Sequence, residues 1–302
     1  MSKRKQPKQG GTDVADDEGE GSDVSLIDVD FEFFDPNPTV DYQALKRLSI
    51  QLFQADAELF HLNELAELIL SQPLVGTTVK TDGKESDPYA VLTVLNMHVH
   101  KDHPSIKALS AYAQSKSSAI PAFQATIQEL LSPTGLESAN HVGFVFSERL
   151  INMPVQVIPP MYRMLADEIQ WALDDNEPYK FSHLLFLTRT YRLTAEEAAV
   201  LEASNHNQRP SKRQKGRPPL QTGNTNSGAD VSNGGTSTYS FHPEDEYIQK
   251  FASHSIDYNL SSAQPRDADA FGLDTAGRIM LVPADRLKDL VQTLSDTYAV
   301  PQ

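Results

Sequence analysis

Hydrophobic and polar positions recur along the chain with two different periods. Residues 27–33 alternate strictly between apolar and acidic side chains, a pattern typical of a half-buried strand. Short apolar runs predict further strands at residues 74–79, 89–97, 141–147, 181–191 and 278–282. A period near 3.6 residues predicts helices around residues 45–52, 62–69, 106–113, 123–131, 162–172, 244–251 and 287–294, three of them opened by prolines. This alternation indicates an α/β protein with strands and helices interleaved through one core.

Two segments lack the apolar residues that a core needs. Residues 10–25 are mostly Gly, Asp, Glu and Ser, and residues 204–237 combine a basic cluster, two prolines and a Gly/Asn/Ser/Thr tract. Such segments cannot offset their ordering entropy by burying apolar surface. We therefore expect a disordered acidic tail with a basic start over residues 1–26, and one domain over residues 27–302 that a disordered insertion interrupts at about 204–237.

Composition narrows the classes of protein further. The 302 residues include no cysteine, which excludes disulfides, Cys-ligated metal sites and thiol nucleophiles. No apolar run approaches the roughly 20 residues of a membrane helix, so we expect a soluble intracellular protein. There are 26 Lys and Arg residues against 41 Asp and Glu residues, a net charge of −15. This balance disfavours direct nucleic-acid binding, which needs clustered cations, and favours a basic protein partner.

A distinctive string of residues joins the strand at 141–147 to the long helix that follows it. It reads Ser147-Glu148-Arg149-Leu150-Ile151-Asn152-Met153-Pro154-Val155-Gln156 and continues to Pro159-Pro160-Met161-Tyr162. Supporting motifs occur near residues 31–35, 87–96, 242–246 and 279–282. In this order the motifs resemble the BCCIP family, over roughly residue 27 to the C-terminus. The resemblance assigns Ser147, Glu148, Arg149, Asn152, Pro154, Pro160 and Tyr162 to a structural signature.

The resemblance implies both a fold and a function. The family resembles the GCN5-related acetyltransferase fold, a mixed sheet flanked by helices, without the acetyl-CoA motif. The resemblance to the fungal branch implies a nuclear chaperone that escorts one large-subunit ribosomal protein of the universal L fourteen family. This branch is also linked to nuclear export of a phosphatidylinositol-phosphate kinase, and the animal branch to a recombination mediator and a cyclin-dependent-kinase inhibitor. The resemblance therefore implies a non-enzymatic protein that shuttles between nucleus and cytoplasm and works with importins or exportins.

The residues themselves offer little support for catalysis or a cofactor. Acetyl-CoA needs a glycine-rich turn before a helix, but residues 98–104 contain no glycine, and His103-Pro104 removes an N–H donor. Gly143 is better explained by packing. His98, His100 and His103 lack the spacing of a metal site, and we expect them at a partly exposed strand end. Glu148 and Arg149 are expected to form hydrogen bonds or ion pairs that orient the following loop. We predict no catalytic residue, cofactor or metal, hence a pseudoenzyme.

Two basic clusters and three acidic groups remain as candidate partner sites. The possible nuclear localisation signals are Lys3, Arg4, Lys5 and Lys8, and Lys212, Arg213, Lys215 and Arg217. The acidic groups are the tail carboxylates between residues 13 and 23, then Asp174, Asp175 and Glu177, and finally Glu244, Asp245 and Glu246. Carboxylates can neutralise a ribosomal protein's Lys and Arg side chains until RNA competes for them. Solvated surface charge is the alternative explanation.

The function predicted from the sequence is a non-enzymatic chaperone that escorts a basic large-subunit ribosomal protein to the nucleus for ribosome biogenesis. One alternative is a nuclear-export, cell-cycle or DNA-repair adaptor, which would bind a lipid kinase or a regulatory protein through an apolar groove. A less favoured alternative is an acyltransferase with an unusual cofactor site.

Overall fold

The computed structural model describes residues 30–72, 74–194, 196–199, 236–263 and 273–298. Residues from Phe31 onward form one compact unit. The predicted tail, both basic clusters and residues 204–235 of the predicted insertion lie outside the described residues. None of the helices in the described ranges has the length and apolar content needed to cross a bilayer.

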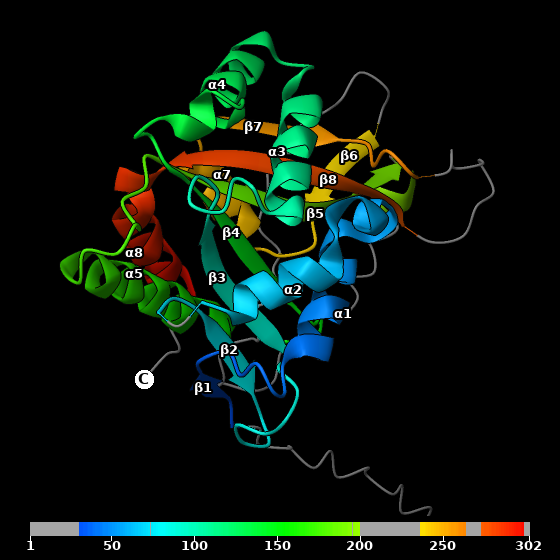
Figure 1. Cartoon of the computed structure of the whole chain (residues 1–302). Coiled ribbons are helices and arrows are strands. Elements are labelled where there is room, and N and C mark those ends of the chain that lie inside the picture. Colours follow the sequence, from blue (N-terminus) through cyan, green and yellow to red (C-terminus); the bar gives the residue numbers. More distant parts are fainter. Residues whose placement is uncertain (1–29, 73, 195, 200–235, 264–272, 299–302) are drawn as a thin grey trace, which may run out of the picture. The chain divides into compact units, whose positions relative to one another are not determined.

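A single mixed sheet forms the centre of this unit (Figure 1). Its strands are β1 (Glu32–Phe34), β2 (Thr77–Lys80), β3 (Ala90–Asn96), β4 (Val142–Arg149), β5 (His183–Thr194), β6 (Thr236–Ser240), β7 (His254–Tyr258) and β8 (Asp274–Pro283). They are ordered β1-β2-β3-β4-β5-β8-β7, and β6 pairs with β5 off this path. Among the described strands, β4 and β5 are the parallel pair, and the other pairs are antiparallel.

Helices cover both faces of the sheet. The helices are α1 (Tyr42–Phe53), α2 (Leu62–Leu70), α3 (Pro104–Ser117), α4 (Pro121–Leu131), α5 (Ile158–Asp174), α7 (Asp245–Phe251) and α8 (Leu287–Tyr298). Short 3-10 turns precede α2, α5 and α8, at Gln54–Phe60, Val155–Val157 and Ala284–Arg286. One buried cluster joins α1 to α4 with one face of the sheet, and a second joins α5, α7 and α8 with the other face. The sheet thus separates two apolar cores, where the sequence had indicated one.

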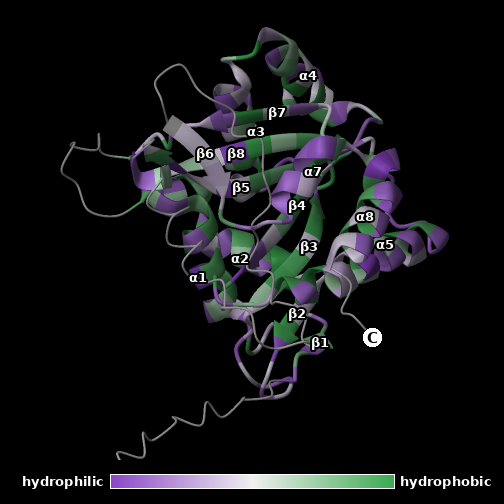
Figure 2. Ribbon diagram, turned by 180° about the vertical axis from the view of Figure 1, so that it is seen from behind, coloured by the Kyte–Doolittle hydropathy of each residue, from purple (hydrophilic) through white to green (hydrophobic). Residues whose placement is uncertain are grey.

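Alternation along the central strands explains this layering. Leu185 and Leu187 of β5 belong to the first cluster, whereas Leu184 and Phe186 belong to the second. Successive side chains of a strand point to opposite faces, so a strand covered on both sides is apolar at nearly every position. The strands β3 and β4 are accordingly mostly hydrophobic along their length (Figure 2).

The predicted α/β class and helix order are confirmed, but two strands were not predicted. The strand β6 is Thr-Ser-Thr-Tyr-Ser and lacks apolar alternation, and its first two residues fall within the predicted insertion. The strand β7 lies at the sheet edge and is half-buried throughout, so its pattern is weak. Both strands are positioned by partners that are distant in the sequence, which a local period does not detect.

The parallel strands β4 and β5 separate before they end. They pair at residues 142–145 and 183–186, while the rest of β4 pairs only with β3. Because β8 occupies the other edge of β5, the strand β6 takes the same edge as β4, at residues 190–194. The chain leaving β6 therefore enters the notch between the diverging strands, where the N–H of Phe241 donates to the carbonyl of Arg189 at 3.2 Å.

Candidate functional site

The signature string forms the end of β4 and the turn into α5. In α/β sheets, ligands bind beyond the carboxyl ends of parallel strands, and here that position is the β4–α5 turn next to the notch. Glu148 and Arg149 are the last residues of β4, and both are buried. Met153, Pro159 and Tyr162 are buried where the turn joins α5, whereas Asn152 is exposed.

Glu148 is the centre of a buried cluster of charged and polar groups. Its carboxylate accepts hydrogen bonds from Arg189 Nε at 2.9 Å and Nη2 at 3.1 Å, and it lies 2.7 Å from His242 Nε2. Gln51 Nε2 and the backbone N–H of Arg149 also donate to it, each at 2.9 Å. Burial alone raises the pKa of Glu148, but the hydrogen bond and charge of His242 together with Arg189 outweigh burial and hold the pKa at about 2. The residue is therefore an ionised structural anchor.

Arg149 extends the cluster to the start of α7. Its guanidinium forms a two-pronged ion pair with Glu244, one contact being 3.0 Å between Nη2 and Oε2. Asp245 is buried beside this pair, and burial together with the charge of Glu244 raises its pKa. Arg149 Nε, Asp245 Oδ2 and the Tyr162 hydroxyl are buried without a protein hydrogen-bond partner. Buried polar atoms of this kind commonly bind ordered water.

Arg278 of β8 forms a second ion pair next to β6. Its Nε donates to Asp257 Oδ1 at 2.6 Å, and its Nη1 donates to Ser240 Oγ at 2.9 Å. Glu246 lies 3.5 Å from the same Nη1. Arg278 and the Glu148 cluster together fix residues 240–246 in the notch, so that the chain's own segment occupies it.

The β4–α5 turn is poorly suited to a phosphate group. A phosphate site at a helix N-terminus needs free backbone N–H groups and close approach. Residues 150–158 contain no glycine, and Pro159 and Pro160 remove two donors from the first turn of α5. This turn follows the parallel strand, whereas the sequence had placed the candidate cofactor turn at residues 98–104, after β3.

The histidines after β3 are separated from one another. The strand β3 ends at Asn96, so His98 and His100 lie in the turn after the strand and not on it. His98 is buried, where a partly exposed position was predicted, because its Nδ1 accepts the Val142 N–H at 3.2 Å and its ring stacks on His141. Burial and the charge of His141 lower its pKa to about 4. Within the described ranges, no group of three His, Asp or Glu residues is placed to bind a metal.

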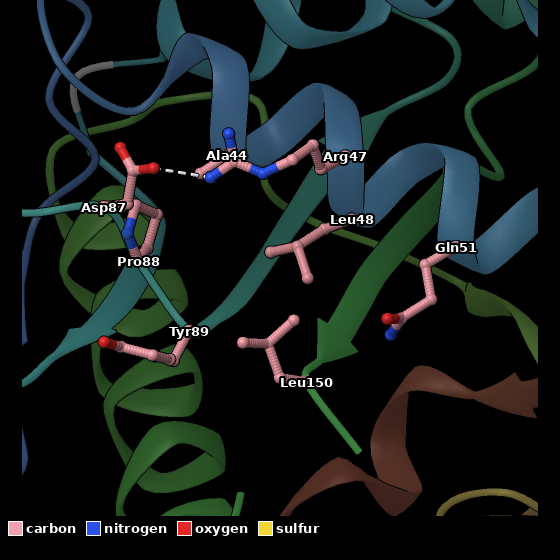
Figure 3. A pocket seen from close by; sticks show the side chains of 8 residues that line it. All are labelled: Ala44, Arg47, Leu48, Gln51, Asp87, Pro88, Tyr89 and Leu150. Atoms are coloured by element: carbon pink, nitrogen blue, oxygen red, sulfur yellow. Dashed lines mark hydrogen bonds and ion pairs between the residues drawn. The ribbon is translucent and has the colours of Figure 1, made fainter. Parts of the chain in front are cut away.

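A pocket of about 410 Å³ lies between α1 and the signature turn (Figure 3). Leu48 and Leu150 point toward each other across it, and Tyr89 lies at its lower side (Figure 3). Arg47 Nη2 donates to Asp87 Oδ2 at 2.5 Å along another side (Figure 3). Its lining is therefore mainly apolar, with one exposed ion pair.

The predicted acidic groups differ in exposure. Asp174, Asp175 and Glu177 are exposed at the end of α5. Glu244 and Asp245 were predicted on an acidic surface, but they are only 2% and 3% exposed. Glu244 lies inside the notch because it forms an ion pair with the buried Arg149, and Asp245 is buried beside this pair. Glu246 is half-buried.

Comparisons with known proteins identify the family. The BCCIP family model matches residues 26–248, which include the whole signature. The chain belongs to the BCCIP family. It is 41% identical to Protein bcp1 of Aspergillus fumigatus over the full length of both chains, and 42% identical to Protein bcp1 of Schizosaccharomyces pombe over 92% of each. The crystal structure of BCP1 from Saccharomyces cerevisiae has the same fold, with a TM-score of 0.58, 24% identity and 93% coverage of both chains.

The partners of the BCCIP signature were not predicted from the sequence. Arg189, His242 and Gln51 all contact Glu148, yet they lie 41, 94 and 97 residues away along the chain. One signal was available: an arginine inside the apolar strand at 181–191 requires a buried anion. Glu148 and Arg149 form hydrogen bonds and ion pairs, as expected from the sequence, with partners that come from β5, α1 and the segment after β6.

Proposed function

We propose that this BCCIP-family chain is a non-enzymatic chaperone that binds a basic large-subunit ribosomal protein of the universal L fourteen family. It delivers this client to the nucleus and so supports ribosome biogenesis. The observation that carries the proposal is the exposed group Asp174, Asp175 and Glu177 on a chain of net charge −15. Outside the ribosome such a client has uncompensated Lys and Arg side chains, which carboxylates can neutralise until RNA replaces them.

The occupied notch supports a role without catalysis. Glu148, the buried carboxylate nearest the carboxyl ends of the parallel strands, is engaged by Arg189 and His242, and its pKa of about 2 leaves it without a proton for acid–base chemistry. Pro159 and Pro160 remove two of the N–H donors that a coenzyme pyrophosphate would use at the start of α5. The finer resemblance to the GCN5-related acetyltransferase fold stays a prediction.

The test is the affinity of the full chain for the purified ribosomal protein at low and high salt. Replacing Asp174, Asp175 and Glu177 by their amides should weaken binding and flatten its salt dependence. A matched control removes three carboxylates from the opposite layer, as Asp102→Asn, Glu129→Gln and Glu137→Gln, and should leave binding nearly unchanged. Absence of binding by the wild-type chain would refute the proposal.

A second candidate function is an adaptor for nuclear export, the cell cycle or DNA repair, with a phosphatidylinositol-phosphate kinase as one partner. The pocket between Leu48 and Leu150 supports it, because an apolar groove suits an apolar partner segment. Ile151, which follows Leu150 in the chain, is 68% exposed and adds apolar surface next to it. The adaptor would be favoured if the chain binds the kinase, if this binding does not depend on salt, and if Ile151→Asp abolishes it.

The proposal includes shuttling between nucleus and cytoplasm by importins and exportins. Its basis is the pair of basic clusters in the sequence. Replacing the basic residues of each cluster by alanine in a fluorescent fusion should move the protein to the cytoplasm, and unchanged nuclear signal would contradict this part of the proposal.

A further inference from the structure

Trp171 is the only tryptophan in the sequence, and it is 64% exposed on α5. Tryptophan is usually well buried, and where it lies at protein surfaces it is enriched among the residues that dominate binding. In this chain the neighbouring helix residues Ile169 and Ala172 pack into the core. The indole is thus held outside the fold by a helix that is firmly anchored.

Carboxylates surround Trp171 on the exposed side of α5. Asp167 lies one turn before it, and Asp174 and Asp175 lie one turn after it, so helical geometry places all three next to the indole. All three are exposed, and Gln170 Nε2 donates to Asp174 Oδ1 at 2.9 Å. The basic residues of the segment 158–182 are Arg163, two turns before Trp171, and Lys180.

The loop between α2 and β2 is held against the same half of α5. Glu168, one turn before Trp171, accepts the Gly76 N–H at 2.9 Å, and the Tyr179 hydroxyl donates to Gln72 Oε1 at 3.1 Å. A hollow of about 240 Å³ lies on this loop, lined in part by Leu74 and the exposed Asp35. The helix that carries Trp171 is therefore tied to a fixed loop, and a shallow hollow with a further carboxylate lies on that loop.

We propose that Trp171, Asp167, Asp174 and Asp175, here named the α5 anchor, bind a Lys- and Arg-rich segment of a protein partner. A cationic side chain stacks on the indole face, and its charge lies within reach of the flanking carboxylates. This inference rests on the proposed function and names the site where the basic client binds.

Charge complementarity decides the occupant. A nucleic acid would place phosphates against carboxylates, which repel them. A second copy of the chain, itself of charge −15, would place like charges against each other. A basic protein segment satisfies both the indole and the carboxylates.

The sole tryptophan makes the site directly measurable. In the full chain, the fluorescence of Trp171 is followed while a tryptophan-free ten-residue peptide of alternating Lys and Arg with Gly spacers is added. The spectrum should change and saturate, and Asp174→Asn with Asp175→Asn should weaken peptide binding. A spectrum that does not respond to the peptide overturns the inference.

Variants connect the site to the client. Trp171→Ala should lower affinity for the purified ribosomal protein about tenfold or more, and Trp171→Phe should retain part of it. The control is Val99→Ala, because Val99 is an exposed apolar residue, 49% accessible, that lies outside the α5 anchor. If the wild-type chain binds the ribosomal protein and Trp171→Ala binds it equally well, the anchor is wrong and the proposed function stands. If the wild-type chain does not bind the ribosomal protein, the proposed function fails, and the peptide titration alone decides on the anchor.

Discussion

Replacing Glu148 by glutamine tests whether the buried cluster holds the chain in the notch. The change keeps the size of the side chain but removes its charge, which leaves the guanidinium of Arg189 buried without an anion. The Arg189 side chain is 7% exposed and that of Glu148 is fully buried. Removing one member of such a pair typically destabilises a protein by about 3–5 kcal/mol.

The pKa of Glu148 gives an independent magnitude. It is held at about 2, against 4.5 for an unperturbed glutamate. At about 1.4 kcal/mol per pKa unit, this difference corresponds to about 3 kcal/mol. Because the folded pKa is the lower one, this stability is present above pH 4.5 and is lost as the pH falls toward 2. The two free-energy estimates agree, and the one from the pKa also predicts the pH range over which this stability is lost.

The assay is urea unfolding of wild-type and Glu148→Gln chains between pH 3 and 7, with amide hydrogen exchange of residues 241–251. The variant should be less stable at pH 7, should lose less stability on acidification, and should exchange faster in α7. Arg47→Ala is the control, because its ion pair with Asp87 is 61% and 56% exposed and should contribute at most about 1 kcal/mol. If Glu148→Gln costs no more than Arg47→Ala, the cluster does not hold the notch closed.

Three further substitutions test other parts of the fold. Gly143→Ala should destabilise by about 1–3 kcal/mol in thermal unfolding, because a Cβ there would lie 2.6 Å from Val94 Cγ2; an unchanged melting temperature would contradict this. Asp56→Asn should speed hydrogen exchange at residues 261–262, whose backbone N–H groups donate to Asp56 at 2.8 and 2.7 Å, and equal exchange rates would show that these bonds are dispensable. Asp245→Asn should gain stability relative to wild type as the pH rises from 4 to 8: burial raises the folded pKa of Asp245, so its ionisation above pH 3.8 destabilises the fold. The same difference in urea stability at both pH values would refute that assignment.

Local sequence signals predicted those parts of the fold that local chemistry determines. The prolines at 104 and 121 begin α3 and α4, because a first-turn proline needs no N–H partner. The packing role of Gly143 was also predictable: a Cβ at this position would lie 2.6 Å from Val94 Cγ2 and 3.1 Å from Leu184 Cδ2. The period of two failed at β6, whose position depends on pairing with β5.

Charged residues were the least predictable part of the candidate site. Glu244 and Asp245 have the same local pattern as the exposed Asp174 and Asp175, namely adjacent carboxylates at a helix end. Their burial depends on Arg149, which lies 95 residues before Glu244 in the chain. A single sequence shows the charge of a residue but not the distant partner that offsets the desolvation cost of burying it.

The occupied notch and the exposed α5 anchor lead to a separation of roles that experiments can resolve. Glu148, Arg149 and Tyr162 of the signature are buried, so their substitution should change stability, and client binding only as far as the folded population falls. Trp171 and its carboxylates are exposed on α5, so their substitution should change client affinity at unchanged stability. Measuring both quantities for Glu148→Gln and Trp171→Ala therefore distinguishes a closed scaffold with an external binding surface from a protein whose notch opens to its client. In the second case, Glu148→Gln would alter affinity measured on the folded chain.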